Sequence, residues 1–331
     1  EGTPVFPMSM PWTLSNRISY ALDLRGPSET VDTACSSSLV ALHRAGVALN
    51  RGECDVALVG AVNLYLHPGK YAYLAHQKMV SPTGHCQPFG AGANGFVPGE
   101  GVVCLVLRRE PDAVAASDRI RAVIAGTAVN HGGKVSGLTV PNPRAQAQVI
   151  AAALADAGLE PDDVDVVEAH GTGTVLGDPI EARGLAQSLT IGRTRPLALG
   201  AVKGHVGHLE GAAGFAGLAK VVLQLQHDQL APTLGSVPRN PAVAAASSLL
   251  DIVDITRPWP SRAGRARVAG ISSFGAGGVN AHVLVAEPPI PGPTLPGIPD
   301  SELPVMAAEV PSRRGGGPGA GAVAGAATEQ P

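Results

Sequence analysis

The sequence predicts an α/β protein with a mostly parallel sheet and helices on its faces. Apolar, β-branched runs alternate along the chain with Ala- and Leu-rich segments of helical spacing, and this order of runs occurs twice. The 331 residues are 45% hydrophobic and 15% charged, which is enough apolar material for a large packed core. Alternating strands and helices are typical of βαβ units, whose strands pair in parallel.

The first half of the pattern surrounds one helical segment, residues 35–50. Four β-branched or apolar runs are predicted as strands: 29–34, 55–63, 101–109 and 120–130. The last two are almost continuously apolar, so we expect buried strands there.

The second half repeats the scheme after a division near residues 131–143. An Ala-rich helix is expected over 144–161, ended by Gly158 and Pro161, and a proline near the start of 178–189 marks another helix. A longer helix is expected over 210–226. The predicted strands of this half are 164–170, 196–203, 266–273 and 282–286.

The composition changes at Pro288. Residues 288–331 are rich in Pro, Gly and Ala and end in RRGGGPGAGAVAGAATEQP. Such a segment cannot bury enough apolar surface to offset the entropy lost on ordering. We therefore expect one domain over 1–287 and a disordered linker or tail over 288–331.

Charge, hydropathy and cysteine content also limit the binding partners and the cellular location that can be expected. A net charge of −3 without a Lys/Arg cluster argues against nucleic acid and anionic membranes, and no apolar run is long enough to span a bilayer. The four cysteines are scattered without a CxxC pair, so neither a disulfide framework nor a thiolate zinc site is expected, and a reducing cytoplasm is the simplest location. The chain opens with Glu1 rather than methionine, which suggests a piece of a longer protein.

Cys35 lies in VDTACSSSLVALH, where a predicted strand meets a predicted helix. Unpaired N–H groups and the macrodipole at a helix N-terminus stabilise a thiolate, so this position predicts a lowered thiol pKa and a nucleophile. The alternative is a packed cysteine among serines, which is the default for an isolated cysteine. Cys54, Cys86 and Cys104 are assigned to that packed class.

Three other motifs follow the ends of predicted strands. EAHGTGTVLGDP places His170 before glycines and threonines that let a ligand approach the backbone. AVKGHVGHLEGAAG carries Lys203 five residues before His208, and GISSFGAGGVNAH places Phe274 in a Gly-rich turn whose N–H groups could form an oxyanion hole. A cysteine, two histidines and a lysine at strand ends together suggest a nucleophile with acid/base and electrophilic partners.

The remaining histidines carry no prediction of chemistry. His205 and His208 are three residues apart with no third ligand in view, so no metal site is expected. The others are expected at the surface or as satisfied core residues: His43, His67, His76, His85, His131, His227 and His282.

The four motifs, in this order, resemble those of the β-ketoacyl synthase (ketosynthase) domains of modular polyketide synthases, in the thiolase superfamily. The family's TACSSS, HGTGT, K-x-x-x-G-H and SSFG-x-G-G-x-NAH are matched at 33–38, 170–174, 203–208 and 272–282. The resemblance covers about residues 1–287. It implies a thiolase-like, duplicated fold of α-β-α-β-α layers, whose first half is incomplete at its N-terminus because complete relatives carry several elements before this segment.

The resemblance also implies a reaction. Cys35 would take an acyl chain as a thioester from an acyl carrier protein, and a second carrier would deliver a malonyl group. Loss of CO2 would leave an enolate that attacks the Cys35 thioester in a decarboxylative Claisen condensation. His170 and His208 would donate to the malonyl thioester oxygen, and Lys203 would orient the histidine pair and bias its charge.

The other implied site residues bind substrate. The N–H groups of Cys35 and Phe274 would hold the second oxyanion, and the Phe274 ring would gate the acyl tunnel. Thr172 and Thr174 would bind the pantetheine arm. No metal or free cofactor is implied, because the substrates ride on the phosphopantetheine of the carrier.

The implied partners are an acyl carrier protein, other polyketide synthase domains and a second copy of the chain, joined through the sheet edge at 29–33. CSSSL is typical of polyketide rather than fatty-acid enzymes. Two further stretches, LYLHPGKYAYLAHQKMVSPTGHCQPFGAGANGFVPGEG and NHGGKVSGLTVPNP, resemble ketosynthases of assembly lines served by a separate acyltransferase.

Two departures from the family pattern stand out. Gly204 and His205 replace the Ser-Asn of KSNIGH, which could alter local hydrogen bonds. Where the family often has DADGYV, this chain has GANGFV, with Asn94 in place of the aspartate before the glycine, which could weaken a structural contact. If this chain is complete, unpaired sheet edges and a bare helix face predict aggregation or weak folding. Two other functions stay open: an inactive docking fragment, and a hydrolase or simple acyltransferase that uses Cys35 with one histidine.

Overall fold

The computed structural model describes residues 10–261 and 264–288. The chain divides into units 1–293 and 294–331, and every described residue belongs to the first. All but the first residue of the expected linker at 288–331 lies outside the described residues.

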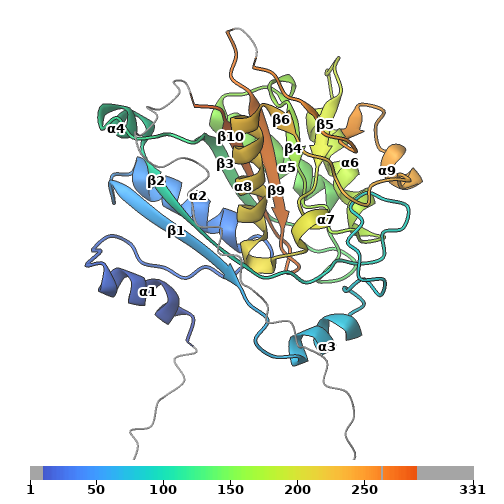
Figure 1. Ribbon diagram of the computed structural model, residues 1–331, viewed down its shortest axis with the longest axis horizontal. Coiled ribbons are helices and arrows are strands. Elements are labelled where there is room, and N and C mark those ends of the chain that lie inside the picture. The colour runs from blue at the N-terminus through green and yellow to red at the C-terminus, as the bar shows by residue number, and fades with distance from the viewer. Residues whose placement is uncertain (1–9, 262–263, 289–331) are drawn as a thin grey trace, which may run out of the picture. The chain divides into compact units, whose positions relative to one another are not determined.

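A six-stranded sheet forms the centre of the described domain (Figure 1). Its strands, in spatial order, are β3 (Val123–His131), β10 (Val279–Ala286), β9 (Val268–Phe274), β4 (Val166–Glu168), β5 (Leu197–Gly200) and β7 (Leu250–Ile252). Neighbours among β9, β4, β5 and β7 are parallel, whereas β10 is antiparallel to both β3 and β9. The prediction of a mostly parallel sheet is therefore confirmed: β3, β9, β4, β5 and β7 run in one direction. Only β10 is reversed, because a turn as short as 275–278 can join only antiparallel strands.

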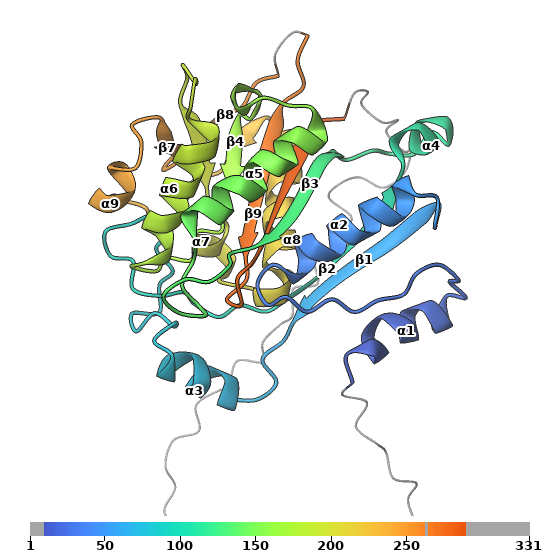
Figure 2. The ribbon, with the colours of Figure 1, turned by 180° about the vertical axis from the view of Figure 1, so that it is seen from behind.

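Alternate side chains along these strands pack against different helices. Val167, Leu199 and Leu284 share a core with α5 (Pro143–Ala157) and α6 (Gly177–Leu189), which lie in front of the sheet in Figure 2. Val166 and Ile271 pack on the opposite side, with α2 (Ser37–Asn50) and α8 (Ala213–His227). The sheet is thus a buried middle layer, which explains the nearly continuous apolar runs in its strands.

A second, two-stranded sheet lies beyond α2. β1 (Val56–Asn63) and β2 (Gly101–Arg108) are antiparallel and pair along their whole length. Since α2 contacts β1 on one side and β10 and β3 on the other, the described residues form four layers in the order α-β-α-β. Four of the five layers expected from the resemblance are therefore present in the described part of the chain.

The two faces of this second sheet differ in exposure. Ala61, Val103 and Leu105 pack toward α2 and α8, whereas Val102 and Val106, on the other face, are 72% and 70% exposed. Leu58 opposes Val106 and is exposed on the same face. The expectation that 101–109 is fully buried is therefore wrong for every second residue.

The other elements are short, and most were not predicted. They are α1 (Trp12–Ala21), α3 (Gly69–His76), α4 (Glu110–Ala115), α7 (Lys203–Val206), α9 (Pro241–Ala244), β6 (Gln229–Leu230), β8 (Arg257–Pro258) and two single 3-10 turns, Pro161–Asp163 and Glu210–Ala212. Conversely, 29–34 forms no strand: within the described residues it has only an isolated bridge between Thr33 and Cys35. β-branched residues favour a strand only where a partner strand accepts their backbone hydrogen bonds.

Helix α5 illustrates a boundary that local chemistry defines. The Asn142 side chain accepts hydrogen bonds from the N–H groups of Arg144 and Ala145, and Pro143 occupies the first helical position. Gly158 ends the helix in a left-handed conformation with φ of 64°.

The exposed face of β2 generates a prediction. Replacing Val102 and Val106 together by lysine should reduce self-association without unfolding the chain, because these side chains form part of an uncovered apolar face. Light scattering coupled to size-exclusion chromatography over a range of concentrations measures this. The matched pair on the inner face, Val103→Lys with Leu107→Lys, should instead lower the melting temperature strongly. Equal effects of the two pairs would show that the faces are not distinct.

Candidate active site

A tight turn before α2 presents Cys35. Ala34 adopts a left-handed backbone conformation with φ of 56°, and the carbonyl of Cys35 accepts a 2.6 Å hydrogen bond from the Ser273 hydroxyl. The turn lies so close to Gly275 that a Cβ there would come within 2.3 Å of the Thr33 carbonyl oxygen. Glycine at 275 is therefore required by this close approach.

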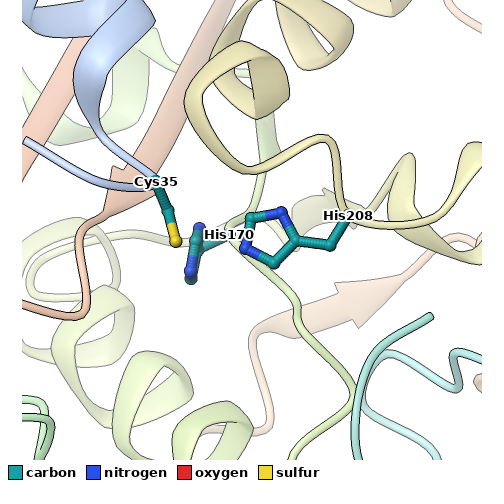
Figure 3. Close-up of side chains that lie close together, drawn as sticks. All are labelled: Cys35, His170 and His208. Atoms are coloured by element: carbon teal, nitrogen blue, oxygen red, sulfur yellow. The ribbon is translucent and has the colours of Figure 1, made fainter. Parts of the chain in front are cut away.

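The structure brings the predicted cysteine and both predicted histidines together. The Cys35 sulfur and one nitrogen each of His170 and His208 lie within 4.8 Å of one another, although the three residues come from different elements (Figure 3). The two imidazole centroids are 5.5 Å apart with the rings nearly perpendicular, and the Phe274 ring lies 5.6 Å from His170. One small substrate group can therefore meet all three reactive side chains.

Backbone hydrogen bonds define which nitrogen of each histidine carries the proton. The N–H of Glu210 donates to His208 Nδ1 at 3.0 Å, and the N–H of Phe274 points to His170 Nδ1 at 3.4 Å. A backbone N–H can only donate, so each Nδ1 is an acceptor and each neutral ring carries its proton on Nε2.

Both histidines are held neutral. Burial, the largest cause, and the positive charge of Lys203 lower the pKa of His170 and of His208 well below the usual value. The rings are therefore hydrogen-bond donors at neutral pH rather than charged acids.

The same hydrogen bonding bears on metal binding. Cys35, His170 and His208 have the residue types and spacing of a three-ligand metal site. A metal at Nε2 would need each proton moved to Nδ1, where it would face an N–H donor of Glu210 or Phe274. This donor arrangement disfavours a metal ion and suits the recognition of an oxygen anion.

The prediction of a lowered thiol pKa at Cys35 is wrong. Cys35 lies just before the first turn of α2, but burial raises its thiol pKa more than the charge of Lys203 and the N–H of Ala276 lower it. The desolvation of a thiolate in this cavity therefore outweighs the stabilisation by the Lys203 charge and the backbone N–H groups.

Lys203 is buried beneath the histidines and contacts the backbone rather than the rings. Its Nζ donates to the carbonyl oxygen of His170 at 2.5 Å. Burial lowers its pKa, against the raising effect of the carboxylates of Glu181 and Glu168. Lys203 thus supplies charge to the site and holds the main chain at His170.

Two buried carboxylates of α6, neither of them predicted from the sequence, hold the loop that carries His170. Glu181 accepts from the N–H groups of His170 and Gly171 at 2.7 and 2.8 Å. Asp178 accepts from the N–H groups of Phe89 and Gly173 at 2.6 and 3.1 Å. The available signal was two acidic residues at the start of a helix that directly follows HGTGT.

The predicted pantetheine residues, Thr172 and Thr174, lie on the same loop. Their hydroxyl oxygens are 3.0 Å apart, and Thr174 Oγ1 also accepts from the N–H of Gly177. Both side chains are partly exposed, whereas the Phe274 side chain is buried beside His170.

The residues that depart from the family pattern have specific partners. A Cβ at Gly204 would come within 2.6 Å of the Leu234 carbonyl oxygen, and His205 Nε2 lies 2.7 Å from the Pro232 carbonyl oxygen. The pair Gly204-His205 therefore ties this loop to the chain at 232–234. Asn94 accepts a 2.7 Å hydrogen bond from Ser81, so this position keeps a structural contact.

Several cysteines and histidines for which no chemistry was predicted lie in surroundings that differ from those expected. Cys104 is exposed rather than packed, although Cys86 is buried as expected. His43 and His131 have partners that the sequence did not reveal: Thr127 Oγ1 for the first, and the Gly277 carbonyl oxygen for the second. His282 is a buried core residue bonded to Ser272 on one side only.

Comparison with known proteins agrees with the motifs. The family description "Beta-ketoacyl synthase, N-terminal domain" matches residues 1–113, and "Beta-ketoacyl synthase, C-terminal domain" matches residues 121–236. Polyketide synthase ThaG of Burkholderia thailandensis is 52% identical over 278 residues, and PksL of Bacillus subtilis is 47% identical over 287 residues. These alignments cover 83% and 84% of this chain, but only 5% and 6% of the relatives.

Solved structures extend the likeness to the fold. The oxazolomycin ketosynthase domain OzmH KS7 of Streptomyces albus JA3453 matches with a TM-score of 0.83 and 45% identity, over 88% of this chain and 51% of that one. The ketosynthase from module 6 of the bacillaene synthase of Bacillus subtilis 168 matches with a TM-score of 0.81 and 42% identity, over 83% and 50%. The chain thus spans about half of each solved ketosynthase, and the predicted thiolase-like α/β fold is confirmed. Across the described part of the chain, no helix combines the length and hydropathy needed to cross a membrane.

The raised pKa of Cys35 predicts its reactivity. The rate of alkylation by iodoacetamide should still be rising at pH 9, because the thiolate fraction increases about tenfold per pH unit below the pKa. Intact mass spectrometry of a variant with Cys54→Ser and Cys104→Ser follows the reaction at Cys35. A rate that levels off below pH 8 would indicate an activated thiolate and contradict the prediction.

Glu181 predicts a pH dependence of stability. Burial raises its pKa to about 7, so the folded state binds this proton more tightly than the unfolded state, whose ordinary value is 4.5. The resulting stabilisation is complete below pH 4.5 and lost as the pH rises through 7. Because glutamine does not titrate, the free energy of unfolding of Glu181→Gln should rise relative to wild type by about 3 kcal/mol between pH 4.5 and 8.

Urea unfolding across this pH range tests that difference, with Glu110→Gln at an exposed position as the control. A constant difference between Glu181→Gln and wild type would show that Glu181 keeps an ordinary pKa in the fold.

Proposed function

The chain belongs to the β-ketoacyl synthase family, as a ketosynthase domain of a polyketide synthase, and we propose that it catalyses decarboxylative Claisen condensation. In the first step, the Cys35 sulfur attacks an acyl thioester on an acyl carrier protein. The acyl chain moves to Cys35, and the carrier thiol leaves with the proton. In the second step, a carrier-bound malonyl group loses CO2, and the enolate attacks the Cys35 thioester. A carbon–carbon bond forms, the bond to sulfur breaks, and a β-ketoacyl chain two carbons longer remains on the carrier.

The observation that carries this proposal is that the Cys35 sulfur and one ring nitrogen each of His170 and His208 lie within 4.8 Å of one another, while backbone N–H groups leave the proton of both neutral rings on Nε2. Decarboxylation places negative charge on the malonyl thioester oxygen, and two N–H donors aimed at one point stabilise it without first losing a charge of their own. A hydrolase that used Cys35 with one histidine would have no role for the second ring. The pair His170 and His208 therefore favours condensation over hydrolysis.

The substrate contacts follow the family pattern. Thr172 and Thr174 lie partly exposed on the loop that carries His170, where they would bind the pantetheine arm of the carrier. Phe274 packs against His170, so its ring would gate the acyl chain. Its N–H points to His170 Nδ1, so the N–H of Cys35 would be the oxyanion donor, and the expectation that the N–H of Phe274 shares this role is wrong. Lys203 would set the charge around the histidine pair.

The proposal includes the surroundings of the domain. The curated relatives are far longer than the region matched, which supports action beside other polyketide synthase domains. We propose that a separate acyltransferase loads the carrier, that the partner is an acyl carrier protein, and that two copies pair through 29–33. The solved ketosynthases of oxazolomycin and bacillaene assembly support the placement in such an assembly line.

A two-stage experiment tests the reaction. Incubation with an acyl thioester should give a mass adduct that Cys35→Ser lacks, and adding malonyl-acyl carrier protein should lengthen the chain. His208→Ala should keep the adduct but lose about a hundredfold or more of the lengthening rate, because it removes a donor to the enolate oxygen.

Each other outcome points to a different function. An adduct that is released without lengthening would favour hydrolysis. No adduct on the wild-type chain would favour a non-catalytic fragment.

A further inference from the structure

A cluster of polar side chains outside the reacting cavity surrounds Glu210, two residues after His208. Lys70 Nζ lies 2.6 Å from Glu210 Oε2, and the Tyr65 hydroxyl donates to Oε1. The Lys70 ammonium also lies 4.7 Å from the centroid of the Tyr65 ring. We call these three side chains the Glu210 clamp. Tyr65 lies between β1 and α3, and Lys70 is the second residue of α3; both are far from Glu210 in the sequence.

The clamp ties both oxygens of a partly buried carboxylate. The Glu210 side chain is 20% exposed and that of Lys70 is 40% exposed, so solvent screens this pair less than a fully exposed one. Burial and the Glu210 carboxylate both raise the pKa of Tyr65, which keeps its hydroxyl protonated and able to donate.

The backbone of Glu210 shows why a clamp is needed. Its φ of 40° lies in the left-handed region, which residues other than glycine seldom adopt. In this conformation the N–H of Glu210 turns back to His208 Nδ1, at 3.0 Å. The bond that defines the His208 tautomer thus depends on a main-chain conformation that a free glutamate would tend to leave.

A second route joins Lys70 to the same histidine. Lys70 Nζ donates to Asn63 Oδ1 at 3.4 Å, and Asn63 Nδ2 donates to the Gly99 carbonyl oxygen at 2.7 Å. The N–H of Gly99 in turn donates to the His208 carbonyl oxygen at 3.0 Å. Lys70 therefore lies where two hydrogen-bond routes to His208 meet, one to its ring and one to its main chain.

We propose that Lys70 and Tyr65 are positioning residues that act through Glu210 to hold His208 as a fixed Nε2–H donor. Neither residue touches the reacting atoms. The inference rests on the proposed function, in which His208 serves decarboxylation of the malonyl group rather than acylation of Cys35. The clamp should therefore matter for one half of the reaction and not for the other.

The test compares the two half-reactions in Lys70→Met. Release of CO2 from carboxyl-labelled malonyl-acyl carrier protein should fall by about tenfold to a hundredfold, because a misplaced donor loses much of its effect on the rate. Acylation of Cys35 by an acyl thioester should stay within about twofold of wild type. Tyr65→Phe should show the same split to a smaller degree.

Two further variants separate positioning from general damage. Lys70→Arg keeps a cation that can bind both Glu210 and Asn63, so it should restore most of the decarboxylation rate. Lys78→Met removes a lysine from the same part of the chain, one that has no ion pair among the described residues, and should leave both half-reactions unchanged.

The tautomer of His208 can be measured by NMR spectroscopy without any catalytic turnover. In protein labelled with 15N-histidine, the His208 signals, assigned by their loss in His208→Asn, should change from a single Nε2–H tautomer in wild type to a mixture in Lys70→Met. Wild-type decarboxylation in Lys70→Met, an equal loss of both half-reactions, or failure of Lys70→Arg to restore the rate would overturn the inference.

The proposed function and the clamp fail in different ways. If the wild-type chain neither acylates Cys35 nor releases CO2, the proposed function is wrong, and the tautomer measurement alone decides the clamp. If the wild-type chain performs both steps while the tautomer of His208 is the same in Lys70→Met, the clamp is wrong and the function stands.

Discussion

The site depends on two imidazoles that are buried without charge and have a fixed proton. Burial and the nearby ammonium of Lys203 keep His170 and His208 neutral, and backbone N–H groups of Phe274 and Glu210 place the proton of each ring on Nε2. A charged ring would attract any anion or solvent, whereas a neutral donor pair is most effective where negative charge develops during reaction. Lys203 can be close without contacting either ring, because it bonds to the carbonyl oxygen of His170.

This arrangement in turn depends on carboxylates that hold backbone rather than substrate. Glu181 and Asp178 accept N–H groups from the His170 loop and from Phe89, and together they define the path of HGTGT against α6. Glu168, at the end of β4, accepts from the Lys220 ammonium at 2.8 Å and from the N–H of Val202, the residue before Lys203. Buried charge is therefore used to fix the two strand ends from which His170 and Lys203 project. Removing one partner of such a pair would leave an uncompensated charge in the core.

The sequence predicted what local chemistry decides. Gly158 was enough to predict where α5 ends, and motif order was enough to predict that Cys35, His170 and His208 share one site, whereas the Asn142 cap at its start was found only in the structure. The sequence did not predict properties that depend on residues far away in the chain. The run 29–34 has strand composition but forms no strand in the described chain. The pKa of Cys35 is raised because desolvation, which the sequence does not show, exceeds the lowering by Lys203 and by backbone N–H groups. Asp178 and Glu181 looked like ordinary helix-start residues, since only the folded loop shows which N–H groups they accept.

A raised thiol pKa at Cys35 is consistent with thioester exchange, because this reaction releases one thiol proton and consumes another. Acylation replaces one thiol by another: the Cys35 proton departs and the carrier thiol receives one, so the step needs no group that keeps a proton afterwards. Neither histidine is suited to keep it, because Nδ1 of each ring already accepts a backbone N–H and Nε2 already carries hydrogen. Once acylated, Cys35 is an uncharged thioester and adds no negative charge beside the malonyl carboxylate before decarboxylation. Because neither histidine has taken the Cys35 proton during acylation, both Nε2–H donors remain available for the enolate that forms when CO2 leaves.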